Sequence, residues 1–262
     1  MTVHEQSRRR PQPWAVLACL ALLLLAVAGS AAAAPTAPAE EFDEGIDYSL
    51  VSDPVRAEAG DDVEVLEFFW YGCPHCFHLE PEMQRWLEHK PADVTFHRVP
   101  AAADPRWVPH AKAFYAAQQL GVLDKLHEPL FKAMHEQRRK ILTEEQIIAF
   151  AAEQGIDEDA FRAAYNSFPV DMQVRKAAEL VQRYNLEGVP TMVVNGKYVT
   201  SATQTGSVAR MFEVVDYLVA QEEGAGGAET QPADAAPAEP QPAAAKPAGG
   251  KPAEEGPAAG AK

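Results

Sequence analysis

The chain has 262 residues, 47% of them hydrophobic, and its 38 acidic side chains outnumber its 23 Lys and Arg to give a net charge of −15. At about 150 residues per domain, this length allows one or two domains. The negative charge excludes a general nucleic-acid or anionic-membrane binder, which would need a basic surface. Beyond residue 35 no apolar stretch reaches about 18 residues, so a multi-spanning membrane protein is excluded too.

The N-terminus, approximately residues 1–34, has the pattern of a secretory signal peptide. Arg8 to Arg10 form a charged start, Trp14 to Ala28 an apolar core, and Gly29 to Ala34 supply small residues for cleavage. The apolar run is shorter than the ~20 residues that a membrane span prefers, although an uncleaved anchor stays an alternative. We therefore predict a mature protein outside the cytoplasm, where disulfides can form.

The C-terminal residues 221–262 have the composition of a tail. Of these 42 residues, 14 are Ala, 7 are Pro and 7 are Gly, and none is Leu, Ile, Val or aromatic. Such a segment cannot bury enough apolar surface to offset the entropy cost of ordering it. We predict that it is disordered, either as an idle extension or as a spacer or tether.

The first part of the folded region predicts a strand, a helix and a second strand. Val63 to Trp70 is a β-branched and aromatic run that indicates a strand buried on both faces, and Tyr48 to Val51 indicates a shorter strand before it. A helix should follow Gly72 and end near His89, before a strand at Val94 to Val99. This order implies a parallel strand pair with a right-handed crossover.

The hydrophobic period is helical from Trp107 to Tyr184, where Thr143 and Gln146 have the form of a capping box. It then changes to a hairpin over residues 191–200, whose Asn195-Gly196 turn suits type I′ geometry. A last helix is expected over Val208–Ala220. The sum is a small α/β sheet interrupted by a helical insertion.

The candidate chemistry lies in Cys73-Pro74-His75-Cys76, where a buried strand turns into a helix. At i and i+3 the two sulfurs share one helix face and lie close enough to bond. Cys73 stands at the helix N-terminus, whose free N–H groups favour a thiolate, and His75 adds a donor or positive charge. A disulfide closing so short a loop stabilises a fold weakly, which favours redox chemistry over a structural role.

Three other interpretations of these cysteines are open to the sequence. A metal site could use Cys73, His75, Cys76 and His78, but on one helix the two His point away from the two Cys, and no second ligand pair follows at zinc-finger spacing. Covalent haem attachment needs His directly after the second Cys, where this chain has Phe77. An inert structural disulfide is the third alternative.

Two motifs resemble the DsbA family of periplasmic thiol:disulfide interchange proteins: the segment from Val65 to Cys76, and Gly188 to Tyr198. Tyr165 to Phe168 is similar too, and the resemblance covers about residues 45–220. It implies an α/β, thioredoxin-like fold with an inserted helical domain. The expected boundaries are 40–104 and 186–220 for the two thioredoxin-like parts and 105–185 for the insertion.

The resemblance implies a role for each residue of the Cys-Pro-His-Cys motif. Cys73 would be the exposed nucleophile that forms the mixed disulfide with a substrate, and Cys76 its buried partner. Pro74 and His75 would set the stability of the thiolate and hence the redox potential. These roles are carried over from the family and are expectations for this chain.

Two further sites follow from the resemblance. Val189-Pro190 matches the family's cis-proline loop, which would place the Val189 backbone beside the sulfurs, ready to pair with an extended substrate. Glu67 matches an acid that assists proton transfer at the buried cysteine. Some relatives pair this acid with a lysine, but this chain has Phe96 there, followed by His97 and Arg98, so the partner stays open. The alternative for Glu67 is a strand-end acid that reaches solvent.

The aromatic residues Trp70, Tyr71 and Phe77 are interpreted as packing around the motif, some of them lining an apolar groove for unfolded chains. The remaining histidines are interpreted as surface or helix-face residues. They are His78, His89, His97, His110, His127 and His135.

The expected function is oxidation of cysteine pairs in newly exported proteins, by a periplasmic monomer without a bound cofactor or metal. Its partners would be reduced, unfolded exported proteins and a quinone-linked membrane oxidase similar to DsbB. A disulfide reductase or isomerase is one alternative, although the family's isomerases carry an N-terminal dimerisation domain for which there is no room before Val63. A groove-using binding module, which would not need the cysteines, is another.

Overall fold

The computed structural model describes residues 42–54 and 62–229. The predicted signal peptide over 1–34 lies outside the described residues, as does the tail from residue 230 onward. The described residues from Glu44 onward belong to one compact unit. In the described ranges, no helix combines the length and the apolar character needed to cross a membrane.

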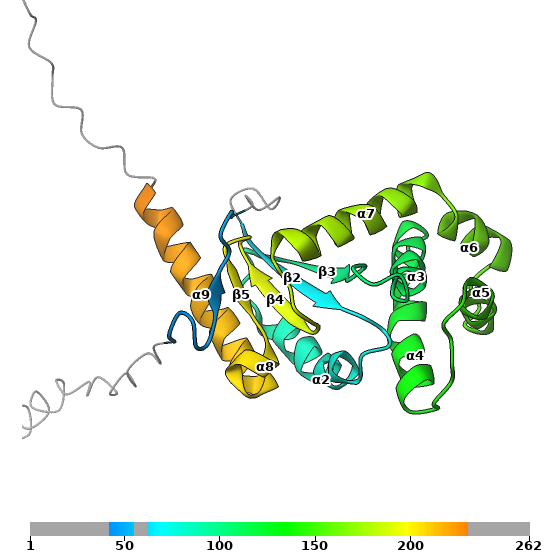
Figure 1. Ribbon diagram of the computed structural model, residues 1–262, viewed down its shortest axis with the longest axis horizontal. Helices are drawn as coiled ribbons and strands as arrows, with labels where there is room; N and C mark the ends of the chain where they lie inside the picture. Colours follow the sequence, from blue (N-terminus) through cyan, green and yellow to red (C-terminus); the bar gives the residue numbers. More distant parts are fainter. Residues whose placement is uncertain (1–41, 55–61, 230–262) are drawn as a thin grey trace, which may run out of the picture. The chain divides into compact units, whose positions relative to one another are not determined.

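A five-stranded mixed sheet forms the centre of the unit, in the order β1-β5-β4-β2-β3 (Figure 1). Its strands are β1 (Ser49–Leu50), β2 (Val63–Phe69), β3 (Val94–Pro100), β4 (Thr191–Val194) and β5 (Tyr198–Thr200). β2 and β3 are parallel and the other pairs are antiparallel. All seven residues of β2 are buried, because strands pair on both its edges and helices cover both its faces. The predicted central strand and its parallel partner are thus confirmed.

The helices fall into two groups along the chain. They are α2 (Pro74–His89), α3 (Val108–Gln119), α4 (Leu123–His135), α5 (Glu144–Glu153), α6 (Glu158–Tyr165), α7 (Phe168–Arg183), α8 (Ala202–Thr205) and α9 (Val208–Glu229). In the chain, α3 to α7 come between β3 and β4, and they form one group of helices (Figure 1). The helices α2 and α9 pack against each other beside the sheet. The thioredoxin-like α/β fold with a helical insertion is confirmed.

Local signals in the sequence produce the expected turns and caps. Asn195 and Gly196 have φ of 50° and 64°, as a type I′ hairpin turn requires. The Thr143 side chain accepts from the Gln146 backbone N–H, and the Gln146 side chain accepts in return from the Thr143 N–H, which completes the capping box. Pro74 stands in the first turn of α2, where its missing N–H has no helical partner to lose.

The end of the last helix was predicted wrongly. We expected the helix to stop at Ala220 and the tail to begin at residue 221, but α9 continues to Glu229. Glu222 explains why the helix continues past Ala220, because its buried carboxylate accepts hydrogen bonds from Asn195, Lys197 and Tyr198 of the β4–β5 hairpin. Composition could not reveal this contact, since its partners lie 24 to 27 residues away. The short helix α8 was not predicted either.

We expect Glu222→Ala to lower the free energy of unfolding by about 1–3 kcal/mol, because it leaves hairpin donors without their acceptor. Glu223→Ala is the matched control, since this neighbouring acid is exposed and a surface change should stay within about 0.5 kcal/mol. Urea unfolding of both variants measures the difference. Equal losses in the two would contradict the assignment.

Candidate functional site

The site begins where β2 ends and α2 starts. A tight turn joins them, closed by the Cys73 N–H donating to the Trp70 carbonyl at 2.9 Å. The Trp70 ring folds over this turn so closely that a Cβ on Gly72 would lie 2.3 Å from it, so only glycine fits there. Cys73 is then the N-cap of α2, with Pro74 next to it, as the sequence predicted.

The two sulfurs have different surroundings although they are one helical turn apart. The Cys76 N–H donates to the Cys73 sulfur at 3.4 Å. Hydrogen bonds from the Cys76 side chain and backbone and from the His75 backbone, with the charge of His75, lower the pKa of Cys73 to about 6. Burial instead raises the pKa of Cys76 far above its ordinary value. The site therefore holds a thiolate at Cys73 and a neutral thiol at Cys76.

Cys73 is less accessible than the exposed nucleophile we expected. It exposes 7% of its surface and Cys76 none, so Cys73 remains the more accessible of the two. Pro74 and His75 are both exposed beside it. The capping geometry explains the difference, because the sulfur turns back toward the helix N–H groups instead of projecting into solvent.

The cis-proline loop lies against the first sulfur. The Val189-Pro190 bond is cis, and the Cys73 sulfur lies 3.4 Å from the Val189 carbonyl oxygen. The Thr191 hydroxyl donates to the Gly188 carbonyl at 2.8 Å, which closes the loop around the proline. The predicted placement of the Val189 backbone beside the cysteines is confirmed.

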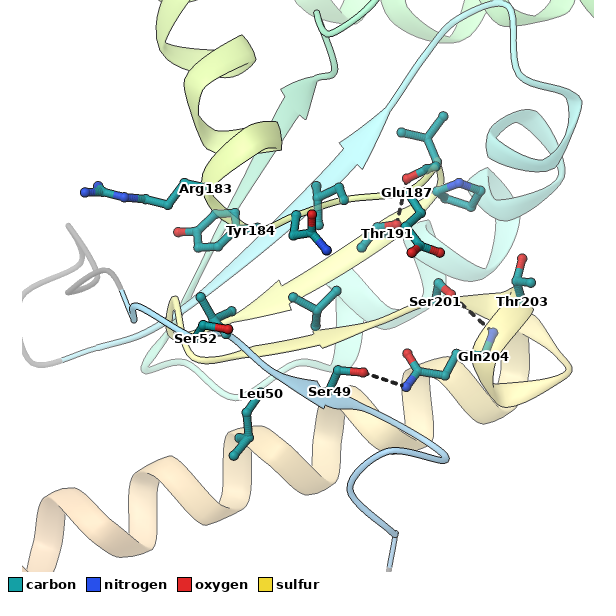
Figure 2. A pocket seen from close by; sticks show the side chains of 17 residues that line it. Ser49, Leu50, Ser52, Arg183, Tyr184, Glu187, Thr191, Ser201, Thr203 and Gln204 are labelled. Carbon is teal, nitrogen blue, oxygen red and sulfur yellow. Dashed lines mark hydrogen bonds between the residues drawn. The ribbon is translucent and has the colours of Figure 1, made fainter.

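A groove of about 660 Å³ extends from this loop across β4, β5 and β1 (Figure 2). Its walls come from β1, the end of α7, the loop of Val189 and Pro190, and α8. Many lining side chains are polar, including Ser49, Ser201 and Gln204. Trp70, Tyr71 and Phe77, the aromatic residues that we considered for an apolar groove, do not line it.

Glu67 is fully buried beneath the motif, so the alternative of a strand-end acid reaching solvent is wrong. Its partner is Arg98, whose Nε donates to Glu67 Oε2 at 2.9 Å. In the parallel pairing of β2 with β3, Glu67 stands directly beside Arg98, while Phe96 stands beside Val65. Burial raises the pKa of Glu67 to about 7 despite the arginine.

Three residues that the sequence analysis did not assign to the site join this pair. Arg98 also donates to Glu80 at 2.9 Å, Glu80 lies 3.3 Å from His127 Nε2, and His127 Nδ1 lies 2.8 Å from the Tyr71 hydroxyl. We call these residues, with Glu67, the Arg98 cluster. Glu80 could have been found from its position four residues after Cys76, on the same face of α2.

The interpretation of His110 and His127 as surface or helix-face residues is wrong, because they expose only 1% and 6%. His110 bonds the Ile141 carbonyl, and His127 belongs to the Arg98 cluster. His127 stands among the buried positions of α4, with Leu126, Leu130 and Phe131, and that helical spacing was the available signal.

The part of the chain that the structure describes contains no group of three or more His, Cys, Asp or Glu placed to hold a metal ion. Its cysteines, Cys73 and Cys76, are free thiols. The arrangement as a whole offers a stabilised thiolate, a buried thiol, a buried acid and an open backbone segment. These are the parts that thiol–disulfide exchange requires.

Comparisons with known proteins point to the same chemistry. The family model for the DSBA-like thioredoxin domain matches residues 109–216. The chain is similar to the thiol:disulfide interchange protein DsbA of Burkholderia cepacia, with 42% identity over 208 residues that cover 79% of this chain and 96% of the relative. DsbA of Pseudomonas aeruginosa PAO1 is 39% identical over 189 residues, covering 72% and 90%.

Solved structures agree. The crystal structure of Pseudomonas aeruginosa DsbA superposes with a TM-score of 0.68 at 38% identity, covering 71% of this chain and 97% of that one. The oxidoreductase DsbA from Xylella fastidiosa gives a TM-score of 0.65 at 32% identity, covering 69% and 97%.

The reduced protein should lose stability relative to the disulfide form as the pH falls from 9 to about 6. The pKa of Cys73 is about 6 in the folded protein against an ordinary 9.0, so its thiolate favours folding fully above pH 9 and not at all below pH 6. The disulfide form has no thiol to titrate, and Cys76 stays protonated across this range. Urea unfolding midpoints of both forms across the range test this; a difference that does not change with pH would contradict it.

Proposed function

The chain belongs to the DsbA family and is a disulfide-forming thiol:disulfide oxidoreductase, and from this premise we propose that Cys73 and Cys76 carry the disulfide that it donates. The single observation that supports this most is the capped sulfur of Cys73 at the start of α2, 3.4 Å from the Cys76 N–H. A sulfur that is stable as a thiolate is a good leaving group, which makes its disulfide a strong oxidant.

The reaction begins on the oxidised protein. A substrate thiolate attacks the Cys73 sulfur, the bond to Cys76 breaks, and a mixed disulfide forms between the substrate and Cys73. A second substrate thiolate then attacks the substrate's own sulfur in that mixed disulfide and releases Cys73 as a thiolate. The substrate loses two electrons and gains a disulfide, and the protein gains the two electrons as a reduced cysteine pair.

Glu67 supplies the proton that this exchange requires at Cys76. When the Cys73–Cys76 bond breaks, Cys76 leaves with a negative charge in a buried place, where burial disfavours that charge. Glu67 holds a proton near neutral pH and is close enough to Cys76 to raise the pKa of that thiol. It donates this proton to Cys76 and becomes a carboxylate paired with Arg98.

Substrate recognition is assigned to the loop of Val189 and Pro190. The Val189 backbone, beside the Cys73 sulfur, would pair with an extended substrate segment through main-chain hydrogen bonds that are independent of sequence. The groove that continues from this loop would hold the rest of the segment (Figure 2). Its polar side chains suit the polar backbone of an unfolded chain.

The proposed setting is the periplasm, with the protein acting as a monomer on reduced, unfolded exported proteins. The signal-like N-terminus and the need for an oxidising compartment support this placement. Each turnover leaves Cys73 and Cys76 reduced, so a second partner must remove two electrons. A quinone-linked membrane oxidase similar to DsbB is the partner proposed for that step.

We expect Cys76→Ala to accumulate mixed disulfides with substrate proteins that carry a disulfide, because the Cys73 thiolate attacks that bond and releases one substrate thiol, and the Cys76 thiol that would resolve the product is gone. Cys73→Ala should trap few, since the remaining thiol is fully buried and protonated. Non-reducing electrophoresis and mass spectrometry of the adducts measure both. Substrates held mainly on Cys76 would reverse the assignment. Function that survives the loss of both cysteines would favour a binding module that does not need them.

His75→Ser should make the protein less oxidising, because it removes a positive charge that favours the Cys73 thiolate. His78→Ser is the control, since His78 is exposed on the same helix and is not among the groups that lower the pKa of Cys73. Equilibration with glutathione measures both variants. An unchanged equilibrium for His75→Ser, or an equal shift in the control, would remove His75 from this role.

A further inference from the structure

Two buried carboxylates share a single guanidinium beneath the cysteines. Arg98 directs Nε at Glu67 Oε2 and Nη2 at Glu80 Oε2, each at 2.9 Å. The side chains of Arg98, Glu67 and Glu80 expose 13%, 0% and 11%. One positive charge balances one carboxylate, and a second unbalanced charge in such a place is costly, so one of the two acids retains a proton near neutral pH.

The two acids are not equivalent as acceptors. Glu80 has a partner at each oxygen, since Oε2 accepts from Arg98 and Oε1 lies 3.3 Å from His127 Nε2. Glu67 accepts from Arg98 at Oε2 only, and its buried Oε1 has no hydrogen-bond partner among the described residues. A carboxylate with more donors is the better place for the negative charge, and an oxygen without a donor is the better place for the proton.

The hydrogen bonds of His127 define which of its nitrogens is the donor. A carboxylate only accepts, so Nε2 must carry the hydrogen that Glu80 receives, and Nδ1 then accepts from the Tyr71 hydroxyl at 2.8 Å. Tyr71 thereby holds the imidazole in the form that donates to Glu80. Burial lowers the pKa of His127, which agrees with a neutral ring.

Several elements packed around the two acids contribute titratable or charged groups. β2 contributes Glu67, its following turn Tyr71, α2 Cys76 and Glu80, β3 Arg98, and α4 His127 together with exposed Glu128, which pairs with Lys132. On the other side of β2, the residue of β4 opposite Glu67 is Met192, which has no charge. The distribution of charge between the two acids therefore depends on Arg98 and on the donors to Glu80.

We propose that His127 is a positioning residue that keeps Glu80 ionised by hydrogen bonding and thereby leaves the shared proton on Oε1 of Glu67. This inference rests on the proposed role of Glu67 as proton donor. During exchange the proton passes from Glu67 to the Cys76 sulfur, and Glu67 becomes a carboxylate beside Arg98. The helical insertion thus supplies a residue that prepares the reaction without touching either sulfur.

Electrostatics agree with this geometry. Burial acts to raise the pKa of Glu80, but the hydrogen bond from His127, the charge of Arg98 and a smaller contribution from a Gln84 hydrogen bond together outweigh it and lower the pKa. Burial raises the pKa of Glu67, where the arginine only partly compensates. The two pKa values are displaced in opposite directions, as the unequal numbers of donors require.

The test locates the proton directly, by carbon NMR of the two glutamate carboxyl groups and nitrogen NMR of His127, in the whole protein with the Cys73–Cys76 disulfide formed, the state that precedes proton transfer, at a pH below 7. In the native protein we expect a protonated Glu67, an ionised Glu80 and the Nε2–H form of His127. His127→Leu should lower the ratio of Glu67-protonated to Glu80-protonated molecules by about tenfold or more, as loss of a hydrogen bond to a charged group predicts. His127→Gln keeps a donor for Glu80 and should restore the native ratio.

A native protein with the proton on Glu80, or with the Nδ1–H form of His127, overturns the proposal even if no variant folds. A folded His127→Leu protein that keeps the native ratio of Glu67-protonated to Glu80-protonated molecules also overturns it. The role of Glu67 is tested separately by the rate of peptide oxidation in Glu67→Gln. If that rate is native while the NMR result is as expected, Glu67 is not the proton donor, but His127 still places the proton. If Glu67→Gln slows oxidation and the NMR result is as expected, His127→Leu should slow oxidation in the native protein and have no further effect in the Glu67→Gln protein.

Discussion

The N-terminal turn of α2 must favour a negative charge at one sulfur and disfavour it at another, and the site depends on this asymmetry. Cys73 is the N-cap, so it receives hydrogen bonds that the helix leaves unused, whereas Cys76 is one turn inside and fully buried. A disulfide between two such sulfurs is attacked at Cys73, and the mixed disulfide that forms is easily resolved because Cys73 then leaves as a stable thiolate. The short turn at Gly72 makes this possible, because it brings β2 directly into α2.

The buried thiol Cys76 needs a proton when it is released from the disulfide. A thiol that is released where charge is costly must be neutralised from within the protein, because solvent does not reach it. Glu67 can do this only if it is itself neutral beforehand, which requires an environment with fewer positive charges than acids. Arg98, shared between Glu67 and Glu80, meets this condition, whereas a separate cation for each acid would ionise both.

The helical insertion takes part in the site and does more than cover the sheet. Two histidines of α4 bond to opposite ends of Tyr71, the residue that precedes Gly72 and Cys73. His127 meets its hydroxyl at 2.8 Å and His135 its carbonyl at 2.7 Å. The position of α4 is therefore tied both to the turn that carries the nucleophile and, through Glu80, to the acid beneath it.

Features that depend on neighbouring residues could be predicted from the sequence, because the chemistry of a turn or a cap is local. Cys73 at a helix start, the Asn195-Gly196 turn and the Thr143 cap are of this kind. The cis bond before Pro190 needed the family resemblance as well. Partnerships between distant segments could not be predicted this way. The pairing of Glu67 with Arg98 depends on strand register, the burial of His127 on how α4 packs, and the length of α9 on the contact of Glu222 with a hairpin. Tertiary structure decided these, because the energy of a buried charge depends on which groups surround it in space.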